Sequence, residues 1–213
     1  MILKWIHPFT AIVAGPSGSG KSHFVTQFIT HLRQMCDTEF ENIFWHHAAT
    51  TTPAALVSDN GDKIRFQIGL PDIDQFDGTT PNLIIIDDMM RESNDAVVDL
   101  FTKGSHHRNL SVFFITQNLF HQGRGQRDIS LNAHYIVCFK NPRDRAQIKF
   151  LARQVSPNQP RFIEDAYTDA TRTAHGYLLL DLKQTTPDDL RVRTCIFPSD
   201  KQNYVYQPIM AAK

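Results

Sequence analysis

Residues 15–22 of the chain read Gly15-Pro16-Ser17-Gly18-Ser19-Gly20-Lys21-Ser22, which matches the pattern GxxxxGK[ST] in full. Glycines let backbone N–H groups approach a phosphate at points where a side chain would clash. The helix expected next turns its positive N-terminal end toward the anion. Lys21 is expected to reach the β- and γ-phosphates, and Ser22 to bind magnesium. The stretch, with His23 directly after it, therefore predicts a phosphate-binding loop (P-loop, Walker A motif) for ATP and Mg²⁺.

A second motif is an apolar run that ends in two acids, Leu83-Ile84-Ile85-Ile86-Asp87-Asp88. This is the Walker B pattern, in which Asp87 is expected to hold the magnesium ion. Asp88 is expected to orient or deprotonate the attacking water, although it is shorter than the more usual glutamate. The alternative is that both acids cap the next helix or turn. Because a complete phosphate loop lies upstream, the catalytic interpretation is favoured.

A third signal places polar groups directly after the buried strand expected at 111–116. Ligands of open parallel sheets lie beyond the carboxyl ends of the strands, so Gln117 is predicted to sense the γ-phosphate or its attacking water. The alternative for Gln117 is a polar strand terminus without a catalytic role. The chain also has room for a strand inserted beside the phosphate-loop strand. That arrangement suits motor-type P-loop ATPases better than nucleotide kinases.

Strand and helix patterns alternate along the chain, which predicts an α/β fold with a mostly parallel central sheet. Strands are expected at 9–14, 42–48, 63–69, 83–86, 111–116 and 135–139, with a terminal strand pair at 177–182 and 190–197. Helices are expected at 23–35, 95–103, 143–154 and 160–171. We expect one domain over 1–213, with its core at about 9–155. The tail 203–213 is either a partner-binding segment or disordered.

Composition sets broad limits. Hydrophobic residues make up 41% and charged residues 21% of the 213, as in ordinary globular proteins. No apolar run approaches the roughly 20 residues that cross a bilayer, so no membrane association is expected. The apolar start 1–14 resembles a signal peptide, but it runs straight into the phosphate loop and is predicted to be its first strand. Three widely separated cysteines predict no disulfide framework and favour an intracellular location.

Charge is distributed unevenly although the net charge is zero. Residues 101–161 carry 10 basic and 2 acidic side chains, whereas residues 1–100 carry 6 and 13. Such a basic region suits contact with a phosphate backbone, with a solvated basic face as the alternative. Arg124 and Arg127 lie in the glycine-containing loop 123–127, which we expect to be a mobile DNA contact. Arg108 is the preferred arginine finger, supplied across a subunit boundary to the transition state. The alternative for these arginines is plain surface charge.

With these motifs in this order, the chain resembles the FtsK/HerA superfamily of P-loop ATPases. It is most similar to the poxvirus-type genome-packaging ATPases of large DNA viruses, virophages and Polinton-like elements. The likeness covers about residues 9–155 and includes the run 115–118 and the run 132–144, an asparagine, a hydrophobic strand and a Pro-x-Asp helix start. It implies a RecA/FtsK-like (ASCE) three-layer sandwich, a homo-oligomeric ring (pentamer or hexamer), double-stranded DNA as substrate, and docking to a viral capsid or portal protein.

The leading hypothesis is therefore an ATPase that translocates DNA and packages a viral genome, in host cytoplasm or nucleus where virions assemble. Hydrolysis would shift the loop that carries Arg124 and Arg127 against DNA phosphates. A nucleotide-gated assembly factor without translocation is the alternative from another class. A nucleotide kinase is less favoured, because the chain has no arginine-rich lid with flanking glycines.

Overall fold

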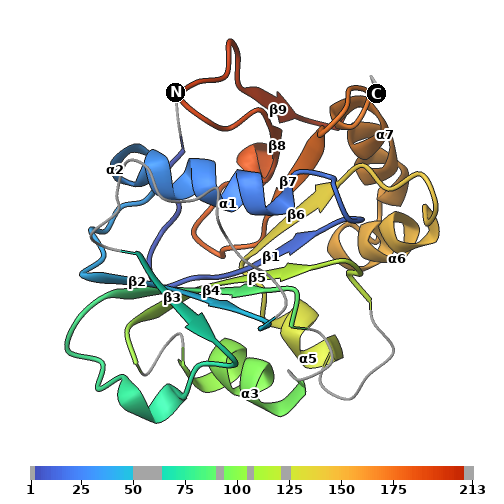
Figure 1. Cartoon of the computed structure of the whole chain (residues 1–213). Helices are drawn as coiled ribbons and strands as arrows, with labels where there is room; N and C mark the ends of the chain where they lie inside the picture. Colours follow the sequence, from blue (N-terminus) through green and yellow to red (C-terminus); the bar gives the residue numbers. More distant parts are fainter. Residues whose placement is uncertain (1–2, 50–63, 90–93, 105–107, 121–125, 209–213) are drawn as a thin grey trace.

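The computed structural model describes residues 3–49, 64–89, 94–104, 108–120 and 126–208 (Figure 1). Within them, nine strands form one sheet with the order β3-β2-β4-β5-β1-β6-β7-β8-β9. The strand bounds are β1 Thr10–Ala14, β2 Asn42–His47, β3 Ile64–Ile68, β4 Asn82–Asp87, β5 Leu110–Thr116, β6 Tyr135–Phe139, β7 Tyr177–Asp181, β8 Val192–Thr194 and β9 Tyr204–Tyr206. The six strands from β3 to β6 in this order pair in parallel, and the last three add on antiparallel.

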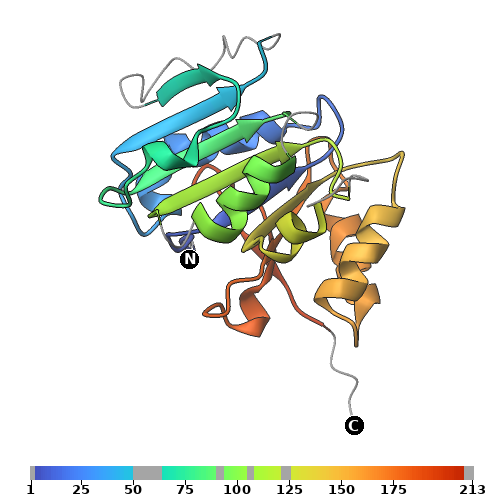
Figure 2. The same cartoon turned by 90° about the horizontal axis from the view of Figure 1, so that it is seen from below.

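Helices cover both faces of the sheet, which gives the predicted three layers (Figures 1 and 2). The α-helices are α1 Lys21–Thr30, α2 Leu32–Met35, α3 Asn94–Asp99, α5 Gln126–Leu131, α6 Ala146–Val155 and α7 Pro160–Ala170. Short turns of other helix types are η1 Ile73–Gln75, the π-helical η2 Leu100–Gly104 and η3 Asp188–Leu190. Within the described part of the chain, each helix is too short or too polar to cross a membrane.

Two hydrophobic cores lie on opposite faces of the sheet, because successive strand residues point to opposite sides. Phe24, Val25 and Phe28 of α1 pack on one face, against Val13 of β1. Helices α3, α5, α6 and α7 cover the other face, where Ile12 of β1 faces them. Strands β1, β5 and β6 are buried along their whole length, as continuous apolar runs in parallel sheets require.

Most predicted elements are present, with differences at their ends. The helix expected at 23–35 begins at Lys21 and ends at Thr30, where His31 leaves helical geometry (φ −104°, ψ 24°) before the short α2. The helix expected at 143–154 begins at Ala146, because the preceding turn is held by side chains. Asn141 Oδ1 accepts from the Arg143 N–H at 3.1 Å, and Asp144 Oδ1 accepts from the Ala146 N–H at 3.1 Å.

Two elements were missed by the sequence analysis. Helix α5 begins at Gln126, so Arg127 lies in a helix and not in the loop that was expected at 123–127. In the tail, Tyr204–Tyr206 forms β9 and pairs with β8 as the last strand of the sheet, so these residues are not disordered, and a role in partner binding stays a prediction. Residues 209–213 lie outside the described residues. Both misses have one cause, since these short segments are stabilised by packing and pairing more than by their own pattern.

The order of the central strands positions the functional loops. Strand β5 lies between β1 and β4, so the strand before the phosphate loop and the Walker B strand are not neighbours. This is the inserted strand for which the sequence had room. All three strands are parallel, and the residues that follow their carboxyl ends therefore meet at one edge of the sheet.

A buried ion pair anchors the antiparallel part of the sheet. Arg193 in β8 donates to Asp181 in β7, and both side chains are only 5% exposed. Burial raises the pKa of Asp181, and the Arg193 charge opposes that rise. Thr186 Oγ1 also donates to Asp181 Oδ1 at 3.0 Å, so the carboxylate is bonded on both oxygens.

We expect the Arg193→Ala substitution to lower the free energy of unfolding by about 3–5 kcal/mol, because it leaves the Asp181 carboxylate buried without its partner. The double variant Asp181→Leu/Arg193→Met should recover most of that loss. Urea unfolding measures both, with the exposed Arg161→Ala as a control that changes stability by less than about 0.5 kcal/mol. A loss below about 1 kcal/mol for Arg193→Ala would contradict this account.

Candidate nucleotide-binding site

The phosphate loop leaves the end of β1 and enters α1, as predicted. Its first residue is fixed by the sheet, since Gly15 N donates to Thr116 O of β5 at 3.2 Å. A Cβ atom on Gly15 would lie 2.6 Å from Phe139 Cβ, so only glycine fits there. Gly18 and Gly20 have positive φ angles of 74° and 106°, which side chains disfavour. Pro16 and Ser17 form the outer part of the loop, and Ser17 is exposed.

Lys21 opens α1 and lies across the loop. Its Nζ donates to Gly15 O at 2.7 Å and to Pro16 O at 3.0 Å, and the residue is 9% exposed. Burial lowers the pKa of the Lys21 ammonium, while the charges of Asp88 and Asp87 oppose that shift. A compact positive charge between the loop and two carboxylates can pair with the terminal phosphates of a nucleotide.

Ser22 and Asp87 come together from α1 and β4. Ser22 Oγ donates to Asp87 Oδ2 at 3.3 Å. Burial raises the pKa of Asp87, with the Ser22 hydrogen bond acting in the other direction. A hydroxyl and a carboxylate are hard oxygen ligands, and two of them suit Mg²⁺, which keeps water and phosphate oxygens in its other positions. Within the described ranges, no three His, Cys, Asp or Glu residues lie together in a group that could hold a metal ion, so no site with more such ligands is formed there.

Asp88 and Gln117 meet at the same edge, beyond the carboxyl ends of β4 and β5. Gln117 Nε2 donates to Asp88 Oδ2 at 2.7 Å, and both side chains are exposed. Asp88 holds a left-handed backbone (φ 52°), and its N–H donates to Ile115 O at 3.1 Å. A non-glycine residue in this conformation costs free energy of order 1–3 kcal/mol and is concentrated at functional sites. The structure therefore joins two of the predicted catalytic side chains in one hydrogen-bonded pair.

His175 is a further contact of the phosphate loop that the sequence analysis missed. Its Nδ1 lies 3.1 Å from Ser19 O, and because a carbonyl oxygen only accepts, Nδ1 carries the proton. The residue lies between α7 and β7, 156 positions from Ser19, in a left-handed conformation (φ 60°). No local pattern marks it, since its role depends on how β7 pairs with β6.

A cavity of about 230 Å³ opens beside the loop on this side. Gly20, His23 and Phe24 line it from the loop and α1. Residues before β7 and after β8 line it opposite, including Ala174, His175, Cys195, Phe197 and Asp200. Its wall is partly aromatic and partly polar. Such a cavity next to a phosphate loop can hold the base or sugar of a nucleotide.

The predicted arginines are not gathered at this site. Arg108 precedes β5 and so lies at the opposite edge of the parallel strands from the phosphate loop of its own chain. There it donates to Phe76 O at 2.6 Å and to Asp74 Oδ1 at 2.9 Å. Arg124 lies outside the described residues, and Arg127 lies in α5 with a side chain that is also outside the description. Any role in a neighbouring subunit stays a prediction.

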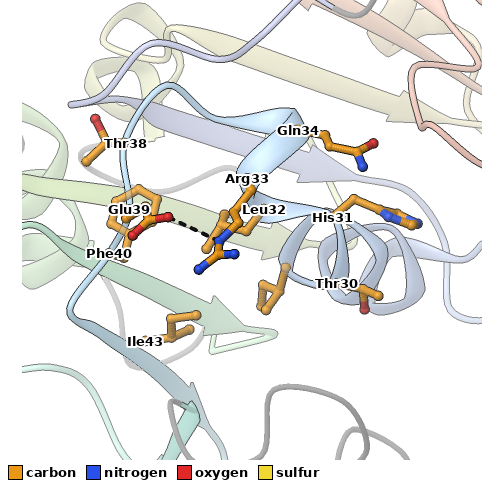
Figure 3. A pocket seen from close by; sticks show the side chains of 10 residues that line it. Thr30, His31, Leu32, Arg33, Gln34, Thr38, Glu39, Phe40 and Ile43 are labelled. Atoms are coloured by element: carbon orange, nitrogen blue, oxygen red, sulfur yellow. Dashed lines mark ion pairs between the residues drawn. The ribbon is translucent and has the colours of Figure 1, made fainter.

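A larger cavity, about 490 Å³, lies at the far end of α1 and along α2 (Figure 3). Ile29, Leu32, Phe40 and Ile43 supply apolar lining, and the Arg33–Glu39 ion pair (3.1 Å) crosses its mouth. Both charged side chains are mostly exposed, so their pairing contributes little. Helix α1 separates this cavity from the phosphate loop by its whole length, and it is no part of the nucleotide site.

Two solved structures share this architecture. The DNA-packaging ATPase B204 from Sulfolobus turreted icosahedral virus has a TM-score of 0.56 at 12% identity, covering 96% of this chain and 99% of that chain. The genome-packaging NTPase B204 from Sulfolobus turreted icosahedral virus 2, in complex with ATP-γS, has a TM-score of 0.54 at 16% identity, covering 95% of this chain and 98% of that chain. The fold is that of a P-loop NTPase. This confirms the predicted fold class over nearly the whole chain, while no protein-family model and no curated protein matches the sequence.

We expect the His175→Gly substitution to weaken binding of an ATP analogue about 5- to 10-fold, the effect of one lost hydrogen bond to the loop. Glycine accepts the left-handed backbone without strain, so thermal stability should not fall. Calorimetric titration gives the affinity and thermal unfolding gives the stability. Unchanged affinity would show that the contact with Ser19 does not order the phosphate loop.

Proposed function

We propose that this chain is an ATP-driven translocase that packages double-stranded viral DNA into a capsid. The observation that carries the ATPase part is the meeting of Lys21, the Ser22–Asp87 pair and the Asp88–Gln117 pair at one edge of the sheet. Carboxylate and amide lie where a water could be oriented against a terminal phosphate held by the loop. The shared fold with two B204 packaging ATPases supports the DNA-packaging part.

Each side chain has a distinct part in hydrolysis. The loop amides and Lys21 bind and orient the phosphates, and Ser22 and Asp87 would hold Mg²⁺, which offsets phosphate charge when bound. Asp88 accepts the proton of the attacking water, and Gln117 holds the Asp88 carboxylate at 2.7 Å. The exposure of both groups leaves space for that water. Oriented attack and charge stabilisation supply most of the rate in phosphoryl transfer.

The remaining partners follow from the same proposal. The basic region 101–161 supports contact with DNA phosphates, through Arg124 and through Arg127 at the start of helix α5. A ring of five or six copies would let one subunit supply an arginine, for which Arg108 stays the candidate, to the site of its neighbour. Docking to a capsid or portal protein and a location at the site of virion assembly complete the proposal.

The cavity of about 230 Å³ beside Gly20 supports a purine site within the same proposal. Phe24 and Phe197 offer an apolar wall, and Gln27 and Asp200 offer a donor and an acceptor at its rim. An aromatic wall with few polar groups is the usual composition of a site for a flat heterocycle. The C-terminal strands would then hold the base, while the N-terminal loop holds the phosphates.

The Asp88→Asn substitution should lower the rate of ATP hydrolysis about 100- to 10,000-fold, because the amide cannot accept the proton of water. Binding of ATP-γS should be retained. Steady-state hydrolysis with and without long double-stranded DNA checks both the chemistry and the motor, with Asp189→Asn, an exposed acid far along the chain, as the control.

Strong DNA stimulation that is lost in Asp88→Asn supports a translocating motor. Hydrolysis that is indifferent to DNA would instead favour the nucleotide-gated assembly factor. Transfer of phosphate to a nucleoside in place of water would point to a kinase. Loss of ATP-γS binding in Asp88→Asn would assign Asp88 to nucleotide binding in place of the chemical step.

Filling the cavity separates base recognition from phosphate recognition. Ala174→Trp should weaken ATP binding about 10-fold or more, since the exposed Ala174 lines the cavity and the indole would occupy it. Inorganic tripolyphosphate should bind as it does to the unchanged protein. Competition titrations measure the affinity of the variant for both ligands. An equal loss of affinity for ATP and for tripolyphosphate would show that the base binds outside this cavity.

A further inference from the structure

Helix α6 carries an exposed row of positive charges. Arg145, Lys149 and Arg153 are spaced four residues apart, and all three are exposed, as is Arg143 just before them. Residues four apart lie on one side of a helix, about 6 Å from each other along its axis. Figures 1 and 2 show α6 at the outside of the molecule, packed against α7. The row therefore faces solvent over about 12 Å.

These charges have no acidic partners within the described residues, in contrast with those of the neighbouring helix. On and after α7, Arg161 lies 4.0 Å from Asp165 and Arg172 lies 3.2 Å from Asp169. Residues 140–153 contain five basic side chains and a single acid, Asp144. Asp144 is occupied within the turn, accepting from Ala146 N and from Gln147 Nε2. The row is consequently an unbalanced positive surface.

Helix stability does not account for the N-terminal part of this row, whereas Arg153, in the last turn of α6, is favourable to the helix dipole. Positive side chains near the N-terminus of a helix oppose its dipole and cost some tenths of a kcal/mol each. Arg143 and Arg145 lie at the N-terminal end of α6, where acidic residues would be favourable. Their presence there suits an anion that approaches from outside.

Helix α6 is also connected to the hydrolysis site by a short path. Gln117, which donates to Asp88, lies two residues before Leu119 in the chain. The Leu119 N–H donates to Gln147 Oε1 in α6 at 2.9 Å, and Gln147 Nε2 donates to Asp144 Oδ2 at 2.7 Å. A displacement of Gln117 on hydrolysis would therefore reach the first turn of α6 directly.

We propose that the row Arg145, Lys149 and Arg153 of α6 grips the phosphate backbone of double-stranded DNA, and that Gln147 links this grip to hydrolysis. The inference rests on the proposed function and adds a DNA surface to it. Duplex DNA carries a phosphate charge for about every 1.7 Å of its axis, so a straight row of exposed cations can meet several phosphates at once. Contacts of this kind read no base sequence and weaken steeply with salt.

The test compares two variants that each lose three exposed positive charges. Arg145→Gln/Lys149→Gln/Arg153→Gln removes the row, and Lys4→Gln/Arg161→Gln/Lys201→Gln removes charges from other exposed positions. Fluorescence anisotropy measures binding to a duplex of about 30 base pairs, with ATP-γS present, at about 50–200 mM salt. The row variant should bind at least about 10-fold more weakly, with a salt slope lower by about 2–3. The control should stay within about 2-fold of the unchanged protein.

Thermal unfolding confirms that both variants are folded. Wild-type affinity and slope in a folded row variant would overturn the α6 proposal and leave the proposed function standing. If the unchanged protein hydrolyses ATP but binds no DNA, the α6 proposal and the DNA part of the proposed function both fail. Unchanged DNA binding with lost binding of polyaspartate would reassign the row to an acidic protein surface.

The link through Gln147 has its own readout. Gln147→Met removes both hydrogen bonds and keeps an unbranched side chain of similar length. DNA affinity should then stay within about 2-fold, whereas stimulation of hydrolysis by DNA should be largely lost. Full stimulation in this variant would show that α6 and the hydrolysis site are not coupled by this path.

Discussion

The phosphate loop can present its amide groups to an anion only because β1 is held rigidly on both sides. Strand β1 is buried along its length between β5 and β6, and the bond from Gly15 N to Thr116 O extends that pairing into the loop. At the same point, the Phe139 side chain leaves no room for a Cβ on Gly15. The course of the loop is thus set by the two neighbouring strands, and the site inherits the rigidity of the sheet.

Two partly buried groups of opposite charge, Lys21 and Asp87, lie beside this loop. Lys21 is hydrogen-bonded to two loop carbonyls, while Asp87 is held by Ser22. Burial moves the pKa of Lys21 down and that of Asp87 up, so both groups favour an added partner of opposite charge. In the proposed function, a nucleotide with magnesium would supply both charges at once. The exposed Asp88–Gln117 pair lies next to them, open to water, which is the arrangement that the proposed hydrolysis needs.

The C-terminal strands are part of the same site and not an appendage. The buried Asp181–Arg193 pair joins β7 to β8, and Thr194 Oγ1 donates to Tyr177 O across the two strands at 2.6 Å. This pairing places His175 against Ser19 and lines the cavity beside Gly20. On the other side of the loop, Gln147 brings α6 into contact with the end of the Gln117 segment. Stability of the sheet edge and function of the loop therefore depend on the same contacts.

The sequence by itself determined the segments predicted to be the phosphate loop, the Walker B acids and Gln117, because each lies in consecutive residues with a strand before it. It also determined most strands and helices, since period and turn residues are local properties. Only the tertiary structure decided that β5 lies between β1 and β4, which brings Gln117 to Asp88 across 29 positions. It alone placed His175 on the loop, Arg108 beside Asp74, and β9 on β8. Strand order follows from the packing of the whole chain, and no local pattern records which distant segments will become neighbours.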